Sequence, residues 1–217
     1  MRTVQDTWST DRIVAALYDT AVQRPVTAWL GARVLWGFDF GVIDEEIRRL
    51  GELPAGTRVL DLPTGGGLAL KTLRPDHGLD YVAADLSTEM LDRAASRASS
   101  RALTGVRFAE ADASALEFAD DAFDVVLSLT GLHCFAEPAA ALAEFRRVLR
   151  PGGELRLTTV VRGAGRRHDD AVRLLRGLGV FGHVGTPEDL GRWLDEAGFR
   201  HVDRSQSGAL AIVRATA

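Results

Sequence analysis

The chain reads Val59-Leu60-Asp61-Leu62-Pro63-Thr64-Gly65-Gly66-Gly67, an apolar segment that ends in an acid and continues into a glycine-rich turn. Glycine at such a turn lets a ligand approach the backbone closely. In open α/β sheets, ligands bind outside the carboxyl ends of the strands, where the strand order reverses. The segment therefore predicts a ligand site in the turn after the first strand of a parallel sheet.

Strand-like and helix-like segments alternate from about residue 57 onward, which is typical of βαβ units. Short apolar runs predict strands at 58–62, 80–84, 106–110, 123–129 and 154–160, and helical periodicity predicts helices at 67–73, 88–102 and 138–149. We expect a doubly wound, mostly parallel, seven-stranded Rossmann-like α/β sheet with right-handed crossovers.

The remaining segments flank this core within one domain, 1–217. Residues 1–50 are expected to form a helical cap rich in aromatic residues: Trp8, Tyr18, Trp29, Trp36 and Phe38. Thr186, Pro187 and Asp189 predict the start of a closing helix, because they fit its cap, first and third positions. Strands at 199–205 and 209–215 are expected to form an antiparallel hairpin after it. The core is then 51–161, and 186–217 closes the domain.

Composition narrows the function classes. The 217 residues carry a formal charge of −4, which does not favour a nucleic-acid partner, although Arg162, Arg166 and Arg167 form a local basic cluster. Cys134 is the single cysteine, so neither a disulfide framework nor a cysteine-rich zinc site is expected. No run approaches the ~18 apolar residues of a membrane span, and residues 1–10 lack the apolar run of a signal peptide. We expect a cytoplasmic protein without a membrane partner; a homodimer is left open.

The glycine turn resembles a dinucleotide fingerprint only in part. Gly65 and Gly67 match the first two glycines of G-x-G-x-x-G, but Leu70 occupies the third position. Asp61 would also repel pyrophosphate oxygens at close range. A cationic ligand such as S-adenosylmethionine, with its ammonium and sulfonium groups, suits this acid better than a nicotinamide dinucleotide.

Two further acids follow the next strands. Asp85 ends the second strand, where its carboxylate could accept both ribose hydroxyls, and Asp112 follows the third, where it could accept from the adenine amine. Each acid alone could simply end a strand or cap a helix. Three at this spacing favour a ligand site.

Residues 57 to about 160 resemble the core of the class I S-adenosylmethionine-dependent methyltransferases, particularly the group that includes quinone-biosynthesis and natural-product enzymes. The matching segments are V-L-D-L-P-T-G-G-G from Val59, Y-V-A-A-D-L-S-T-E-M-L from Tyr81, A-D-A from Ala111, F-D-V-V-L-S from Phe123 and R-V-L-R-P-G-G from Arg147. They cover about half of the chain. One position departs from the pattern, because Pro63 stands where most members have the first glycine of the loop.

The resemblance implies S-adenosylmethionine as cofactor and a role for each matched residue. Asp61, Gly65 and Gly67 would surround its methionine part, and Asp85 would bind the ribose. The adenine contacts and the amino-group contacts implied in the same way are Leu86, Met90, Asp112, Ala113, Ser128 and Leu129. Core packing explains Met90 equally well. Tyr18 is a weaker candidate for closing over the cofactor.

Methyl transfer to an alcohol or phenol also needs a group that removes the proton. His133 is the first candidate, because residues 128–135 leave the fourth strand beside the expected methyl position. His168 and His183 are weaker candidates in 162–185, the segment that contributes to the acceptor pocket or lid in relatives. Loop packing or surface placement would explain all three. Their spacing does not fit zinc, so no metal is predicted.

Three functional hypotheses remain at this point. The leading one is methyl transfer to a small molecule, at oxygen, in secondary metabolism. The second is an enzyme that binds the same cofactor but catalyses a rearrangement, cyclisation or decarboxylation without methylation. The third, a nicotinamide oxidoreductase, is disfavoured by Asp61 and Leu70.

Overall fold

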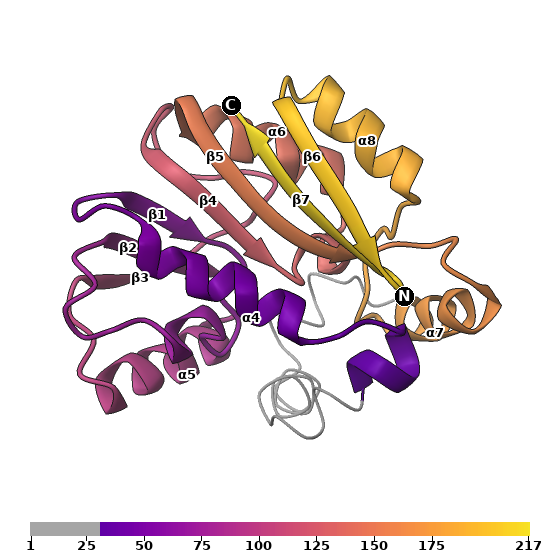
Figure 1. The fold of residues 1–217 in the computed structure, drawn as a ribbon, viewed down its shortest axis with the longest axis horizontal. Helices are drawn as coiled ribbons and strands as arrows, with labels where there is room; N and C mark the ends of the chain where they lie inside the picture. The colour runs from indigo at the N-terminus through magenta and orange to yellow at the C-terminus, as the bar shows by residue number, and fades with distance from the viewer. Residues whose placement is uncertain (1–30) are drawn as a thin grey trace.

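A computed structural model describes residues 31–217, which build one seven-stranded sheet in the order β3-β2-β1-β4-β5-β7-β6 (Figure 1). The strands are β1 (Arg58–Asp61), β2 (Asp80–Asp85), β3 (Val106–Glu110), β4 (Phe123–Leu129), β5 (Leu149–Val160), β6 (Arg200–Ser207) and β7 (Leu210–Thr216). Strands β1 to β5 pair in parallel, and β7 pairs antiparallel with both β5 and β6. The predicted doubly wound sheet with a closing hairpin is confirmed.

Helices cover both faces of this sheet (Figure 1). Their bounds are η1 (Gly31–Trp36), α4 (Gly41–Arg48), η2 (Arg49–Glu52), η3 (Ala69–Lys71), α5 (Thr88–Ser100), η4 (Leu132–Cys134), α6 (Pro138–Val148), α7 (Arg166–Gly177) and α8 (Pro187–Glu196). Helices α6 and α8 bury Phe145 and Leu194 in one core, whereas α4 and α5 bury Ile47 and Ala94 in the other. None of the helices described has the length and apolar content to cross a membrane.

Several local predictions hold because their signals are local. Thr186 caps α8 and accepts from the Asp189 N–H, while the Asp189 carboxylate accepts from the Thr186 N–H, so the predicted cap is a complete capping box. The observed bounds of β3 and β4, 106–110 and 123–129, are those that the apolar pattern predicts. Short apolar runs bounded by turns are therefore enough to locate these strands.

Two predicted elements are wrong in their extent. The helix predicted at 67–73 is only the 3-10 turn η3, because Gly65 and Gly67 adopt φ of +53° and +77° and keep the preceding chain in a turn. Strand β5 begins at Leu149 rather than 154, since Leu149 pairs with Phe123 before the register shifts. Of the predicted N-terminal helical segment, 31–52 contains η1, α4 and η2. Trp8, Tyr18 and Trp29 lie outside the described residues.

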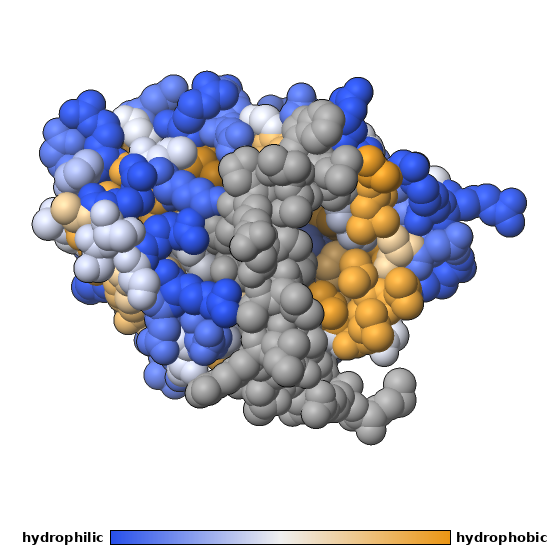
Figure 2. All heavy atoms as spheres, turned by 90° about the horizontal axis from the view of Figure 1, so that it is seen from below, coloured by the Kyte–Doolittle hydropathy of each residue, from blue (hydrophilic) through white to orange (hydrophobic). Residues whose placement is uncertain are grey.

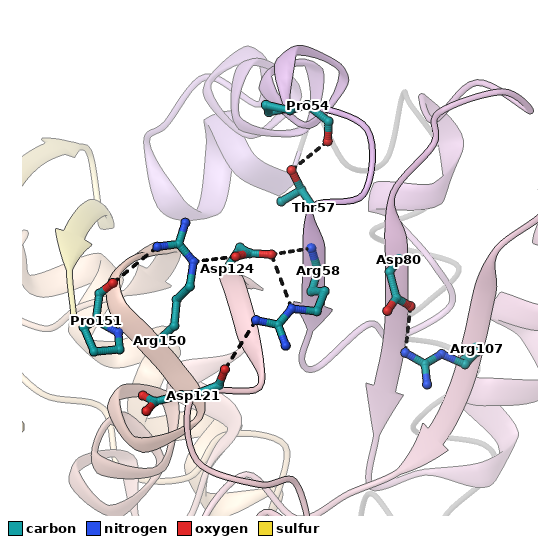
Figure 3. Close-up of polar contacts among 9 residues, drawn as sticks. All are labelled: Pro54, Thr57, Arg58, Asp80, Arg107, Asp121, Asp124, Arg150 and Pro151. Carbon is teal, nitrogen blue, oxygen red and sulfur yellow. Dashed lines mark hydrogen bonds and ion pairs between the residues drawn. The ribbon is translucent and has the colours of Figure 1, made fainter.

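At the amino ends of the strands, acidic side chains pair with arginines and with a backbone N–H (Figure 3). Asp124 on β4 accepts from the Arg58 backbone N–H at 2.7 Å and from the Arg150 guanidinium. Burial raises the pKa of Asp124, but the hydrogen bonds and charges of Arg58 and Arg150 outweigh that effect and hold the pKa below its usual value. Asp80 and Arg107 form a second pair, with 46% and 66% of their side chains exposed. Acids at this edge are thus neutralised by arginine.

Asp124→Ala is expected to lower the free energy of unfolding by about 2 kcal/mol, because it leaves a backbone N–H and a guanidinium without their acceptor. Asp80→Ala removes an exposed pair and should cost less than about 1 kcal/mol. Urea unfolding of both variants measures the difference. Since the folded-state pKa of Asp124 is depressed, its contribution is present above about pH 4 and is lost as the pH falls further. Equal losses for the two variants would contradict this assignment.

Candidate cofactor site at the carboxyl edge of the sheet

Strands β1, β2 and β4 end at one edge of the sheet, and backbone hydrogen bonds tie the loops that follow them. The Leu62 N–H donates to the Leu127 carbonyl, and the Thr64 N–H donates to the Ala84 carbonyl. The loop after β1 is thereby held between its two neighbouring strands. The strand order reverses at this loop, because β2 lies on one side of β1 and β4 lies on the other. Ligands of open α/β sheets bind in the crevice at such a point.

Asp85 links this loop to the end of β2. Its Oδ2 accepts from the Gly65 N–H at 2.9 Å, and its Oδ1 accepts from the Ser87 N–H at 2.9 Å. Burial raises the pKa of Asp85 to about 6, although hydrogen bonds from the backbone of Ser87, Gly65 and Leu86 oppose that shift. Ser87 in turn caps α5 by accepting from the Met90 N–H. The carboxylate, the glycine loop and the start of α5 form one connected unit.

Asp61 is the second buried acid at this edge. The Thr64 hydroxyl donates to Asp61 Oδ2 at 2.7 Å. The buried Tyr81 hydroxyl lies close enough to lower the pKa of Asp61, although it forms no well-aligned hydrogen bond. Burial dominates and, with Asp85 nearby, raises the pKa of Asp61 to about 7. Sequence reasoning assigned no role to Thr64 and Tyr81, although both lie in the matching segments, because their proximity to Asp61 arises only in the folded chain.

The two glycines of the loop have different surroundings. A Cβ on Gly65 would meet no atom of residues 31–217 within 4 Å, so this part of the chain leaves the backbone there open to a ligand. A Cβ on Gly67 would lie 3.0 Å from Leu70 Cδ1 and 3.3 Å from Ala94 Cα, so this glycine lets α5 pack on the loop. Of the two positions that the sequence assigns to the ligand, only Gly65 is open to one.

Pro63 is accommodated by a glycine from another loop. The Leu62–Pro63 peptide bond is cis, and a Cβ on Gly131 would lie only 2.1 Å from Pro63 Cδ. Gly131 also lies beside Ser128, whose buried Oγ has no hydrogen-bond partner within residues 31–217. Because buried hydroxyls are seldom left without a partner, Ser128 offers a polar group to a ligand here. Gly131 is a residue of the site that no sequence motif signalled.

The predicted adenine-side residues lie around the ends of β2 and β3. Met90 and Ala113 are buried, as is Leu129 at the end of β4, and Leu86 is half-buried. Asp112 Oδ1 accepts from the Ser114 N–H at 2.9 Å and from its hydroxyl at 2.7 Å, which is a local turn. The contacts of these residues with adenine stay predictions.

The geometry of His133 does not favour a general base. The side chain is buried, and its Nδ1 accepts from the Val160 N–H at 3.1 Å, so a neutral ring carries its proton on Nε2. Burial lowers the pKa of His133 to about 3. The ring packs on Phe181 and borders a space of about 10 Å³, which holds one water at most. His133 therefore fits the loop-packing alternative, and its catalytic role has no support in this arrangement.

His168 and His183 differ in the burial and hydrogen bonding of their rings. His168 Nδ1 donates to the Ala164 carbonyl at 3.2 Å, which leaves Nε2 as an acceptor, and Nε2 is buried without a partner among the described residues. His183 is exposed and stacks edge-on against Trp193. Of the three predicted histidines, only His168 keeps a buried acceptor nitrogen.

The chemistry of this edge suits a cationic ligand. Asp61 and Asp85 are buried with 2% and 6% of their surface exposed, and no arginine or lysine within 31–217 pairs with either acid. Buried charges without a partner are costly, so a bound cation would offset the cost. Together with the open backbone at Gly65 and the Ser128 hydroxyl, these acids fit a ligand that carries both positive charge and hydroxyl or amine donors. In the same part of the chain, no three side chains gather as metal ligands.

Comparison with known proteins identifies the segment that carries this site. Residues 60–157 match the family model described as a methyltransferase domain. The demethylmenaquinone methyltransferase of Thermus thermophilus is 48% identical over 102 residues, which are 46% of this chain and 46% of that protein. The chain spans about half the length of the curated relatives that it matches first.

Two solved structures have similar folds over nearly the whole chain. Phosphoethanolamine N-methyltransferase 2 of Haemonchus contortus, in complex with S-adenosyl-L-methionine, matches with a TM-score of 0.71 and 22% identity, covering 94% of this chain and 46% of that one. The [4+2]-cyclase SpnF matches with a TM-score of 0.69 and 22% identity, covering 99% and 97%. At these identities, the likeness concerns the fold.

The stability of the protein should depend on pH through Asp61. Its pKa is raised in the folded state to about 7 from an ordinary value of 3.8, so the wild type loses stability as the pH rises between those values. Asp61→Asn removes this titration, and the stability gap in its favour should widen by about 4 kcal/mol from pH 4 to pH 8. Chemical denaturation across this range measures the gap. Parallel curves would contradict the assignment.

His133 and His168 should differ in tautomer. In ¹⁵N-edited NMR at pH 7, His133 is expected as the neutral Nε2–H form and His168 as the Nδ1–H form, because their Nδ1 atoms face an N–H and a carbonyl respectively. The lowered pKa should keep His133 neutral to below pH 5. His133→Gln and His168→Gln assign the resonances. An Nδ1–H tautomer at His133 would contradict this assignment. It would leave Nε2 as a proton acceptor and make His133 a candidate base again.

Proposed function

The chain belongs to the S-adenosylmethionine-dependent methyltransferases, and on that premise we propose that it binds S-adenosylmethionine at the carboxyl edge of the sheet and transfers the methyl group to a small molecule. The observation that carries the proposal is the pair of buried acids beside the glycine loop, Asp61 and Asp85, with which no basic residue of the described part of the chain pairs. The ammonium and sulfonium of this cofactor are the positive charges that such a pair favours.

In this proposal, each residue at the edge has a binding task. Asp61 holds the positively charged end of the cofactor, and the open backbone at Gly65 allows close approach. Asp85 is kept in place by the Gly65 and Ser87 N–H groups while its remaining acceptor capacity serves the ribose hydroxyls. Ser128, on β4, supplies a hydroxyl. The adenine side and the end of β4 are lined by Leu86, Met90, Asp112, Ala113 and Leu129.

For methyl transfer, the main task of the protein is to position the two reactants. When bound, S-adenosylmethionine supplies an electrophilic methyl group on a sulfonium. The protein has to hold the acceptor in line with the departing sulfur and exclude water. For a hydroxyl acceptor, we propose that His168 replaces His133 as the group that takes the proton, because His168 Nε2 is an acceptor nitrogen without a partner among residues 31–217.

The second candidate is a reaction that uses the bound cofactor without methylation. Its support is that residues 31–217 offer no histidine at the fourth-strand loop able to act as a base, and that the fold also occurs in the cyclase SpnF. Product analysis separates the two candidates, because only methyl transfer consumes S-adenosylmethionine.

The narrower expectations complete the proposal. The acceptor reacts through oxygen in secondary metabolism, in a cytoplasmic setting and without nucleic acid. The chain acts as one domain, with 51–161 binding the cofactor and 162–185 contributing to the acceptor side. A homodimer remains compatible with it.

Calorimetric titration with S-adenosylmethionine and with S-adenosylhomocysteine tests the proposal. We expect micromolar affinity for the wild type and at least a tenfold loss in Asp85→Asn, about 1.4 kcal/mol, because the amide keeps the shape but not the charge that accepts two hydroxyls.

Asp80→Asn is the matched control, since Asp80 begins the same strand at the opposite edge of the sheet and should leave the affinity unchanged. The absence of heat with both ligands, in protein shown to be folded by circular dichroism, would refute the proposal. An equal loss in both variants would remove Asp85 from the site.

A further inference from the structure

Exposed apolar side chains are concentrated on two neighbouring elements. Within residues 31–217, five large apolar side chains are exposed, and four of them lie on η1 and at α7: Val34, Leu35, Leu174 and Leu178. We call these four the η1–α7 patch. The exposed fractions of Leu174 and Leu178 are 64% and 62%. Figure 2 shows apolar side chains gathered on this side of the molecule, next to hydrophilic ones. Clustered exposure of this kind marks an interaction surface.

The patch is firmly attached to the fold. Val172, on the opposite side of α7, is fully buried in a cluster with Val160 and Phe181. Trp36 at the end of η1 stacks on Phe181 with ring centroids 5.7 Å apart. Leu174 and Leu178 are four residues apart and therefore share one helix face. The exposed leucines belong to an anchored amphipathic helix.

Basic residues flank the apolar stripe. Helix α7 contains four arginines and two aspartates, in a chain whose formal charge is −4. Arg166, Arg167 and Arg173 are exposed; Arg167 lies seven residues before Leu174 and so shares its face. Asp170 is engaged by Arg173, and Asp169 accepts from the Gly163 N–H. The charge that remains beside the leucines is positive.

We propose that the η1–α7 patch docks on an anionic lipid surface. A helix that presents leucine between arginines lies in the boundary of a bilayer, with the apolar side chains among the acyl chains and the guanidinium groups at the headgroups. Peripheral docking requires no spanning helix, so it amends the sequence-based expectation that no membrane is a partner.

Docking in this way would orient the cofactor site. Helix α7 follows the carboxyl end of β5, and Asp85 and the glycine loop lie at the carboxyl ends of the parallel strands β1 and β2. The edge that carries the site would therefore face the bilayer. This inference goes beyond the proposed function and does not depend on it, because docking can be measured without cofactor.

Cosedimentation of the full chain with vesicles tests the proposal. The probes are phosphatidylcholine vesicles and vesicles of phosphatidylcholine mixed with phosphatidylglycerol. We expect binding to the mixed vesicles that weakens with salt. Leu174→Ser with Leu178→Ser should lower the partition coefficient at least tenfold, and Arg166→Gln with Arg167→Gln should lower it about tenfold on the mixed vesicles only.

Matched controls come from elsewhere on the surface. Phe108→Ser changes the fifth exposed apolar residue, on the edge strand β3, and Arg107→Gln with Arg200→Gln removes the same charge near the amino ends of β3 and β6. Both should bind as the wild type does. No binding, or equal losses in patch and control variants, would overturn the proposal. A dimer in light scattering that the leucine substitutions abolish would assign the patch to a second copy and also overturn it.

Discussion

The hydrogen bond from the Gly65 N–H to the Asp85 carboxylate is the contact on which the architecture of the site depends. It joins the loop after β1 to the end of β2, and through Ser87 it reaches the start of α5. A buried carboxylate is unfavourable. The backbone donors of Ser87, Gly65 and Leu86 offset only part of that cost, because the pKa of Asp85 is still raised. The same geometry therefore fixes the loop and keeps an affinity for positive charge and hydroxyl donors.

Sequence predicts much of this fold because the relevant signals are local. The sequence signals for strands such as Val106–Glu110 and for the capping box at Thr186 lie within a few neighbouring residues. The failures arise where tertiary structure decides. Residues 67–73 have a helical pattern, but the positive φ at Gly67 lets Ala94 of α5 pack on the loop, and only a 3-10 turn follows. The early start of β5 depends on pairing with Phe123, which no local pattern contains.

The site shows the same division. Asp61 and Asp85 could be predicted because each ends a strand, and the carboxyl ends of parallel strands meet at one edge. Thr64, Tyr81 and Gly131 could not, since each acts through a residue placed by the fold. His133 illustrates the limit most clearly. Its position after β4 led to the prediction of a base, but the Val160 N–H on β5, 27 residues away, donates to the ring nitrogen that would have to accept a proton.

The two edges of the sheet differ in the groups that pair with their acidic side chains. The acids of one edge stabilise the fold, and those of the other fit a ligand site. At the amino edge, Asp124 is matched by arginine and a backbone N–H, so its charge stabilises the folded chain at neutral pH (Figure 3). At the carboxyl edge, the donors to Asp61 and Asp85 within residues 31–217 are all neutral, so a bound cation would stabilise the ionised forms of these acids. A marginally stable domain can tolerate such uncompensated burial only if the rest of the sheet holds it. The charge pairs of the amino edge and the apolar layers on both faces supply that support, which leaves the carboxyl edge free to be optimised for binding.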